Sequence, residues 1–220
     1  MRLKAWEELP DQLKTESVRP YYDALRKKQG ALFCKRLTDL LLSAALLVVL
    51  SPVLLVLAIC IKLDSPGTVF FRQVRVTQYG REFRIFKFRT MVQDAPKLGS
   101  AVTVKNDMRI TRMGRLLRGC RLDELPQLWN ILKGEMSFVG PRPERKYFYE
   151  QFEKYIVGFS NRLVVTPGLT GYAQVNGGYE LTPEEKIVYD MEYIARRSIR
   201  LDLQCIVKTA LLIFTHDGAR

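Results

Sequence analysis

Histidine is almost missing from this sequence of 220 residues, and the chemistry that depends on it is not expected. The single copy, His216, lies near the C-terminal end, so neither a histidine-based triad nor a histidine zinc site is predicted. The four cysteines are scattered without a redox or metal spacing, which favours free thiols in a reducing compartment. The phosphate-loop pattern G-x-x-x-x-G-K-[ST] and the dinucleotide fingerprint G-x-G-x-x-G are also absent. Any nucleotide chemistry must therefore use another kind of site.

Acidic residues are scarce as well. The chain has 35 Lys and Arg against 23 Asp and Glu, which gives a formal net charge of +12. This balance favours anionic partners, namely nucleic acid, acidic lipid headgroups or phosphorylated small molecules. Residues 1–33 are polar and mix acids with bases, so no secretory signal is expected there.

One long apolar run stands out against this basic background. Residues 40–61 contain no charged side chain and are long enough to cross a bilayer as a helix. Pro52 in the middle predicts a kink, because it removes a backbone donor and clashes with the preceding turn. Bases flank both ends, whereas a spanning helix should be asymmetric. These features favour a re-entrant segment that bends at Ser51-Pro52, with a straight transmembrane anchor as the alternative.

The other predicted elements are shorter. Residues 1–33 read as a peripheral extension with an amphipathic helix around 21–28, and residues 69–91 as a β-hairpin turning at 78–80. The hairpin's bases form either a solvated face or a surface for headgroups or substrate phosphate. Residues 93–106 read as a mobile loop.

Helical patterns dominate the second half of the chain. Apolar spacing predicts a helix over about 110–117, and Pro126 suits the first position of the next helix. Residues 167–171 read as a turn. Thr182-Pro183-Glu184-Glu185 predicts a capping box at the start of a helix that runs to about Arg196. Residues 199–214 predict a final helix that could lie in a membrane interface. The expected class is α+β, mostly helical.

Asp123 and Glu124 are the leading candidates for chemistry. They lie at or just before a predicted helix start, where capping is the ordinary role of acids. Arg118 and Arg121 precede them and would keep a carboxylate ionised. Pro141-Arg142-Pro143 holds an arginine rigidly, as suits a bidentate phosphate donor. The residues alone thus indicate a membrane-associated protein that handles phosphate, and the apolar run disfavours nucleic acid as a partner.

Six motifs resemble those of the bacterial sugar transferases, also called monotopic phosphoglycosyl transferases. The resemblance covers the chain from about Phe33 to the C-terminus and leaves the first 30 or so residues outside. The motifs are Lys35-Arg36-x-x-Asp39, Ser51-Pro52, Phe86-Lys-Phe-Arg-Thr-Met91, Leu122-Asp-Glu-Leu-Pro-Gln127, Lys133-Gly-Glu-Met-Ser-Phe-Val-Gly-Pro-Arg-Pro-Glu144 and Pro167-Gly-Leu-Thr-Gly-Tyr172.

The resemblance implies a membrane-bound enzyme on the cytoplasmic face of a bacterial inner membrane. Such enzymes move a sugar 1-phosphate from a UDP-sugar to polyprenyl (undecaprenyl) phosphate and release UMP. This is the first membrane step in assembling glycoconjugates such as exopolysaccharide, capsule or O-antigen. Asp123 would form a covalent phosphosugar intermediate, and Glu124 would hold Mg²⁺.

The resemblance also assigns roles to other residues. Arg118 and Arg142 would bind substrate phosphate, together with Lys87 and Arg89. Lys35, Arg36 and Asp39 would anchor the re-entrant helix at 34–64, Ser51 and Pro52 would break it, and 65–220 would form the catalytic domain with interfacial helices.

Two alternatives stay open. One is direct single displacement with Asp123 as a metal ligand only; the other is a non-catalytic membrane adaptor of a polysaccharide assembly complex. The sequence is equally compatible with a monomer and a homo-oligomer.

Overall fold

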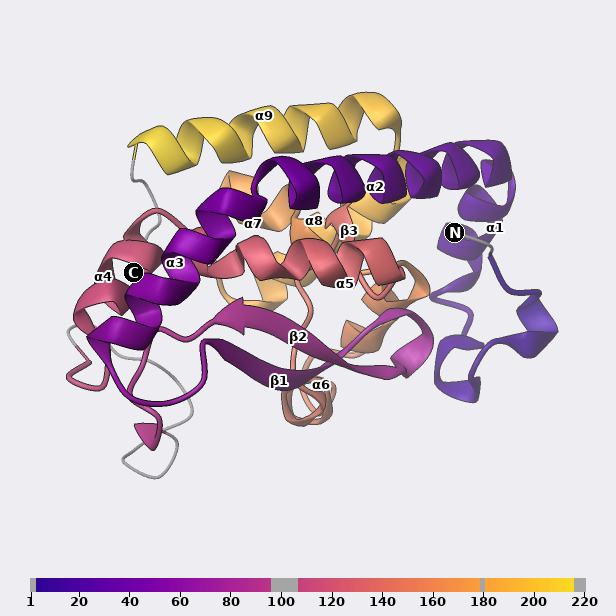
Figure 1. Ribbon diagram of the computed structural model, residues 1–220. Helices are drawn as coiled ribbons and strands as arrows, with labels where there is room; N and C mark the ends of the chain where they lie inside the picture. The colour runs from indigo at the N-terminus through magenta and orange to yellow at the C-terminus, as the bar shows by residue number, and fades with distance from the viewer. Residues whose placement is uncertain (1–2, 96–106, 179–180, 216–220) are drawn as a thin grey trace.

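The computed structural model describes residues 3–95, 107–178 and 181–215 (Figure 1). Within them the protein is mostly helical with two short two-stranded sheets, which confirms the predicted helix-rich class. The loop predicted at 93–106 lies mostly outside the described residues. The helices and strands are α1 (Arg19–Arg26), α2 (Gln29–Val49), α3 (Ser51–Asp64), β1 (Phe70–Val76), β2 (Glu82–Phe88), α4 (Arg112–Gly119), α5 (Leu128–Lys133), β3 (Ser137–Val139), α6 (Lys146–Phe152), β4 (Gly168–Thr170), α7 (Tyr172–Asn176), α8 (Pro183–Arg196) and α9 (Ile199–Thr215), with 3₁₀ helices η1 (Trp6–Glu8), η2 (Asp11–Leu13), η3 (Gln78–Gly80), η5 (Leu122–Gln127) and η6 (Phe159–Val164).

The apolar run forms the helix pair α2 and α3, bent by 61° at the predicted position. Pro52 lies in the first turn of α3, where its missing N–H costs no helical hydrogen bond, and Ser51 Oγ donates to the carbonyl of Val48. α2 begins at Gln29, five residues before the predicted boundary. Among the described helices none is by itself long and apolar enough to cross a membrane, whereas this bent pair passes that test of length and composition together.

Three polar residues of α2 tie the pair to the rest of the protein. Lys35 Nζ lies 2.7 Å from Asp202 Oδ2 on α9. Arg36 donates to the carbonyls of residues 131 and 132, at the C-terminal end of α5, and the Asp39 carboxylate accepts from the backbone N–H of Phe138. In Figure 1, α9 and α2 run along the top of the view and the β1–β2 hairpin lies below them, while α3 descends from the end of α2 to the level of the hairpin.

The hairpin forms as predicted, with β1 antiparallel to β2 from Phe70↔Phe88 to Val76↔Glu82. Side chains alternate along β2, so Phe83 and Ile85 turn inward and are buried against α5 and Met136. The same alternation puts Lys87 on this inner face. The hairpin thereby presents one lysine toward η5, the segment that carries the acidic pair.

Residues 3–32 pack into the main core. Leu13, Val18, Tyr22 and Leu25 are buried in one cluster with residues of β3, η6, α8 and α9. α1 lies close to the predicted amphipathic helix. The segment expected as a peripheral extension therefore contributes directly to the core.

Two local predictions were wrong. Pro126 does not open a helix: it lies inside η5, and α5 begins only at Leu128. Arg121, which lies between α4 and η5, has a left-handed backbone (φ 54°) and precedes the first residue of η5, Leu122. Residues 168–170 form β4, parallel to β3, rather than a turn. The capping box at Thr182, helix α8 and helix α9 agree with the predictions.

Candidate active site

Glu124 lies between two cations from distant parts of the chain. Lys87 Nζ on β2 is 2.5 Å from its Oε1, and Arg142 Nη2 is 2.7 Å from the same atom. Burial would raise the pKa of Glu124, but the two cations outweigh it and hold the pKa well below the usual range. Glu124 is therefore a fixed carboxylate that remains ionised.

Asp123, the adjacent residue, has a different environment. Its carboxylate is half-buried and, within the described part of the chain, makes no hydrogen bond or ion pair. Burial raises its pKa, while the charges of Lys87, Arg118 and Arg142 oppose the rise and favour the ionised form. The two neighbouring carboxylates thus differ in their contacts: Glu124 is paired with two cations, whereas Asp123 has no partner among the described residues.

Close backbone packing places Arg142 beside Glu124. The strand β3 delivers the chain to Gly140, whose N–H donates to the carbonyl of Thr170, while the N–H of Gly168 donates to the carbonyl of Pro141. A Cβ on Gly140 would lie 2.5 Å from the backbone oxygen of Thr166, so only glycine allows this approach. The parallel pair β3–β4 therefore fixes the start of the Pro-Arg-Pro segment.

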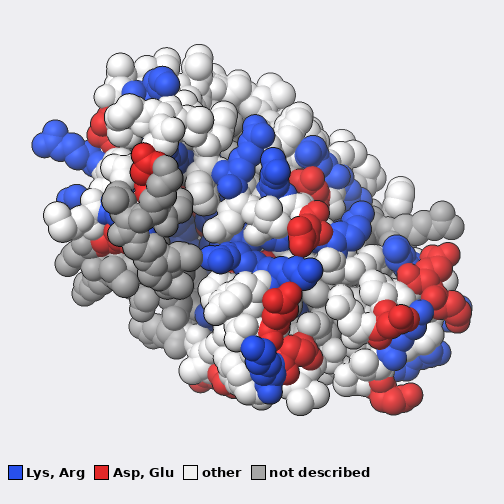
Figure 2. Space-filling model, turned by 90° about the horizontal axis from the view of Figure 1, so that it is seen from below, with Lys and Arg blue, Asp and Glu red and all other residues white. Residues whose placement is uncertain are grey.

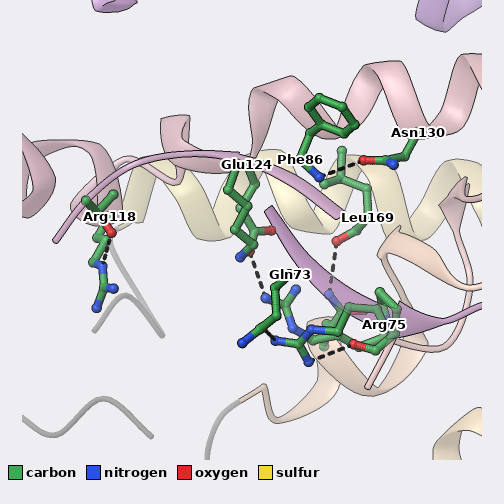
Figure 3. A network of polar contacts seen from close by, with 12 residues as sticks. Gln73, Arg75, Phe86, Arg118, Glu124, Asn130 and Leu169 are labelled. Atoms are coloured by element: carbon green, nitrogen blue, oxygen red, sulfur yellow. Dashed lines mark hydrogen bonds and ion pairs between the residues drawn. The ribbon is translucent and has the colours of Figure 1, made fainter. Parts of the chain in front are cut away.

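Two further arginines hold this segment from outside. Arg75 on β1 donates to the carbonyl of Pro143 and lies 3.2 Å from the carboxylate of Glu144. Arg162 donates to the carbonyl of Arg142 and is paired at 2.7 Å with Asp190 on α8, both side chains being 2% exposed. Burial raises the pKa of Asp190 to about 6 against the pull of Arg162. In Figure 3, Glu124 points toward the cluster around Gln73 and Arg75.

Sequence reasoning missed Arg162 and Asp190 as positioning residues. The available signal was an arginine followed directly by the apolar run Leu163-Val164-Val165, since a base in such a run has to be buried with a partner. Asn130 was missed too. It is fully buried, accepts from the N–H of Phe86, and donates to the carbonyl of Arg84, so it continues the edge of β2 and attaches α5 to the hairpin.

Arg118 and Arg89 are placed differently from the central group. Arg118 Nε donates to Thr90 Oγ1, and in Figure 3 it lies apart from Glu124. Arg89 is buried at the end of α3, where it donates to the carbonyls of Ser65 and Pro66 and to the Ser65 hydroxyl. These contacts give Arg89 a structural role, so its predicted phosphate binding is not supported by the geometry.

The acidic pair fits a magnesium ion better than a metal held by protein alone. Among the described residues no group of three or more His, Cys, Asp or Glu side chains is arranged to hold a metal. Mg²⁺ is commonly bound by one or two carboxylates together with substrate phosphates and water. Glu124, with Asp123 beside it, would supply the protein carboxylates of such a set if a phosphate-bearing substrate provided the remaining oxygens.

The surface around the hairpin is basic. Figure 2, which views the molecule from below Figure 1, shows Lys and Arg gathered across the middle of this face, with acidic side chains among them. Arg72 on β1 lies over the ring of Phe86 at 4.5 Å. A face of this kind attracts anions before they reach the site.

Comparison with known families identifies the class of protein. The chain belongs to the bacterial sugar transferase family, whose model matches residues 30–216. The chain is 44% identical, over 86% of its length, to UDP-N-acetylgalactosamine-undecaprenyl-phosphate N-acetylgalactosaminephosphotransferase of Aeromonas hydrophila. It is 46% identical, over 84% of its length, to UDP-glucose:undecaprenyl-phosphate glucose-1-phosphate transferase of Xanthomonas campestris pv. campestris.

The lengths of these relatives differ from that of the chain. The matched region is 45% and 40% of the two proteins, so the chain spans less than half of either. An uncharacterized sugar transferase of Bacillus subtilis is 36% identical over 84% of the chain, and there the match covers 89% of the relative. The family match takes in the acidic pair, the Pro-Arg-Pro segment and the bent helix pair.

Proposed function

We propose that this protein transfers a sugar 1-phosphate from a UDP-sugar to polyprenyl phosphate, with Asp123 as the covalent nucleophile. The observation that carries the proposal is the division between the two carboxylates: Glu124 is held by Lys87 and Arg142, whereas Asp123 is unpaired among the described residues. The names of the relatives mention a UDP-sugar and undecaprenyl phosphate, which supports the substrates proposed here.

The reaction proceeds in two displacements on phosphorus. A carboxylate oxygen of Asp123 attacks the β-phosphorus of the UDP-sugar, and the bond from that phosphorus to the bridging oxygen breaks, so UMP leaves with the electron pair. An oxygen of polyprenyl phosphate then attacks the same phosphorus and breaks its bond to Asp123. The carboxylate is regenerated, and the product is a polyprenyl diphosphate sugar. No proton transfer is required, which suits a site without histidine.

The cations around the acidic pair stabilise the charge that moves in both steps. Arg142 and Lys87 lie where phosphate oxygens would approach Asp123, and Arg118 adds positive charge from α4. When bound, Mg²⁺ would neutralise the diphosphate and the leaving UMP, with Glu124 as its protein ligand. Substrate phosphate would then compete with Glu124 for Lys87 and Arg142.

The proposed setting is the cytoplasmic face of a bacterial inner membrane, with α2–α3 as a re-entrant helix. The bend of 61° and the exposed apolar side chains along both helices support this arrangement. Apolar side chains on α9 would rest in the interface beside the pair. They include Leu203, Val207 and Leu211, each more than half exposed.

The nucleophile is tested by replacing Asp123 with asparagine, which keeps its size and removes its charge. UMP release is measured with undecaprenyl phosphate and UDP-glucose, UDP-galactose or UDP-N-acetylgalactosamine. Asp123→Asn should lower the rate by about 10³-fold or more. Incubation with UDP-sugar and Mg²⁺ but no lipid should add one phosphosugar mass to the wild type and none to the variant. Glu150→Gln, at an exposed acid on α6, is the matched control and should keep both signals.

Each alternative gives a distinct result. Direct single displacement requires that wild type show neither the mass adduct nor UMP exchange without lipid, even while it releases UMP in the full assay. The adaptor role requires that wild type release no UMP with any of the sugars. Full activity of Asp123→Asn would exclude Asp123 as the nucleophile.

A further inference from the structure

A basic cavity of about 240 Å³ lies away from the acidic pair. It is bounded by the first turns of α2, the hairpin turn η3, the loop after α5 and the end of α8. The lining does not include the residues to which the proposed reaction is assigned, namely Lys87, Arg118, Asp123, Glu124 and Arg142. Its volume far exceeds the roughly 10–15 Å³ that one water molecule needs. The charged side chains that line it are Lys4, Lys35, Arg36, Arg81, Arg197 and Asp39.

Two of the five cations already have strong partners. Lys35 is paired with Asp202, and Arg36 donates to the two carbonyls at the end of α5. Asp39, the only acid in the lining, accepts from the N–H of Phe138. Even when Asp39 and Asp202 are both counted, the cations around the cavity exceed the acids by three. A small, partly enclosed space with this excess favours an anion.

Arg197 is the most informative of these side chains. Its residue is only 5% exposed, yet among the described residues Nε and Nη1 have no hydrogen-bond partner. Its backbone accepts from Lys28, and its guanidinium lies 5.9 Å from the ring centre of Tyr193, so the side chain is held in place. Leaving charged donors buried and unsatisfied is costly. Both atoms are shut off from solvent, so an oxyanion in the cavity would offset the charge of the guanidinium rather than bond to these two nitrogens.

Two exposed bases complete the arrangement at the rim. Lys4 and Arg81 line the cavity from the N-terminal segment and the hairpin turn. Lys4 Nζ lies 5.4 Å from the ring centre of Tyr79, whose own backbone is in the left-handed region (φ 63°). Long flexible bases at a rim can close over a bound anion, while buried Arg197 supplies a fixed positive charge.

We propose that this cavity is a second phosphate-binding site, with Arg197 as the buried cation and Lys4 and Arg81 as the closing bases. The phosphate belongs either to a phospholipid headgroup, which the nearby start of α2 would bring within reach, or to a soluble phosphate. The site does not depend on the proposed transfer reaction. Loss of transfer in Asp123→Asn would leave this binding intact.

Binding is measured on the full chain in detergent, as the shift in thermal unfolding temperature against concentration of probe. The probes are dihexanoyl phosphatidylglycerol, inorganic phosphate and, as a lipid without phosphate, dihexanoyl glycerol. For the wild type at least one of the two phosphate probes should raise the unfolding temperature, and dihexanoyl glycerol should not. The half-saturating concentration should rise at least tenfold in Arg197→Gln and severalfold in Arg81→Gln. Arg196→Gln, next in sequence but 67% exposed and outside the cavity, should match the wild type.

The outcomes separate the sources and the rival sites. A shift with the lipid alone assigns a headgroup, and a shift with inorganic phosphate assigns a soluble phosphate. No shift of the wild type with either probe overturns the proposal. So does an unchanged half-saturating concentration in Arg81→Gln, because binding would then lie elsewhere, such as beside Glu124. Arg81 is exposed, so this variant decides the matter even where Arg197→Gln fails to fold.

Discussion

At the scale of the residue, chemistry here is decided by partners rather than by residue type. Asp123 and Glu124 are adjacent acids, but only Glu124 forms ion pairs with Lys87 and Arg142. Arg142 and Arg89 are both arginines of family motifs, yet one faces the acidic pair and the other fixes the end of α3. The lowered pKa of Glu124 and the raised pKa of Asp123 follow from these differences.

The ion pairs of Glu124 predict a pH dependence of stability. The pKa of Glu124 is lower in the folded than in the unfolded protein, where it is about 4.3, so the unfolded state binds more protons at acidic pH. The stabilisation is therefore complete above about pH 5 and is lost as the pH falls. Glu124→Gln should be less stable than wild type at pH 7 by about 1–3 kcal/mol.

Urea unfolding in detergent from pH 7 to pH 4 measures this difference. The gap between wild type and Glu124→Gln should narrow as the pH falls below about 5. A gap that widens toward acidic pH would contradict the assigned ion pairs. Glu150→Gln, at an exposed position, serves as the control and should track wild type throughout.

At the scale of the element, short segments set the geometry of the site. The 3₁₀ helix η5 carries both acids, β2 supplies Lys87, and the β3–β4 pair delivers Arg142. α4 packs so tightly on Thr90 that a Cβ on Gly114 would overlap the backbone carbonyl there. The same helix carries Arg118, which donates to Thr90 from the next turn.

Gly114→Ala should therefore destabilise the protein by about 1–3 kcal/mol, because α4 would have to move off Thr90. Transfer activity should fall with it, since Arg118 and the start of η5 would shift. Gly119→Ala, in the last turn of the same helix, meets no atom within 4 Å and should be neutral or stabilising by up to about 1 kcal/mol. Thermal unfolding and UMP release on both variants check this. Equal stability of the two alanine variants would refute the close packing of α4 on Thr90.

At the scale of the whole molecule, apolar and basic side chains gather on largely different parts of the surface. Exposed apolar side chains line α2, α3 and α9, with a smaller group on β1 at Phe70, Phe71 and Val74. Basic side chains gather, with some acidic ones among them, across the face seen in Figure 2. Three polar residues of α2, Lys35, Arg36 and Asp39, hold the apolar pair against the rest of the protein through four hydrogen bonds. This separation suits a protein that rests on a membrane and collects an anionic substrate from water.

The re-entrant arrangement predicts that both ends of the helix pair lie on the same side of the membrane. Cys34 is exposed in the second turn of α2, before the apolar run begins, and Thr68 is exposed after the end of α3. Single-cysteine proteins carrying Cys34 or Thr68→Cys, with the other cysteines replaced by serine, are labelled in sealed inverted vesicles by a membrane-impermeant maleimide. Both should react from the cytoplasmic side. Reaction of the two positions from opposite sides would show a spanning helix instead.

The sequence by itself determined the features that depend on near neighbours. The break at Pro52, the hairpin around Gln78–Gly80 and the capping box at Thr182 follow from backbone constraints and periodicity within a few residues, and the structure has all three. The acidic pair and the Pro-Arg-Pro segment were also recognisable as motifs. The misplaced start of α5 shows the limit: neither the left-handed backbone of Arg121 nor the 3₁₀ helix that follows it was predicted from the sequence.

Only the tertiary structure decided which charges meet. Lys87 and Arg142 lie 37 and 18 residues from Glu124 in the chain, and Arg197 reaches the cavity beside Arg36 from the far end of α8. The parallel strands β3 and β4 depend likewise on contact between segments some 30 residues apart. The energy of a charge depends on burial and on the charges around it, and the fold sets both. That is why Glu124 is paired with two cations, whereas Asp123 has no partner among the described residues.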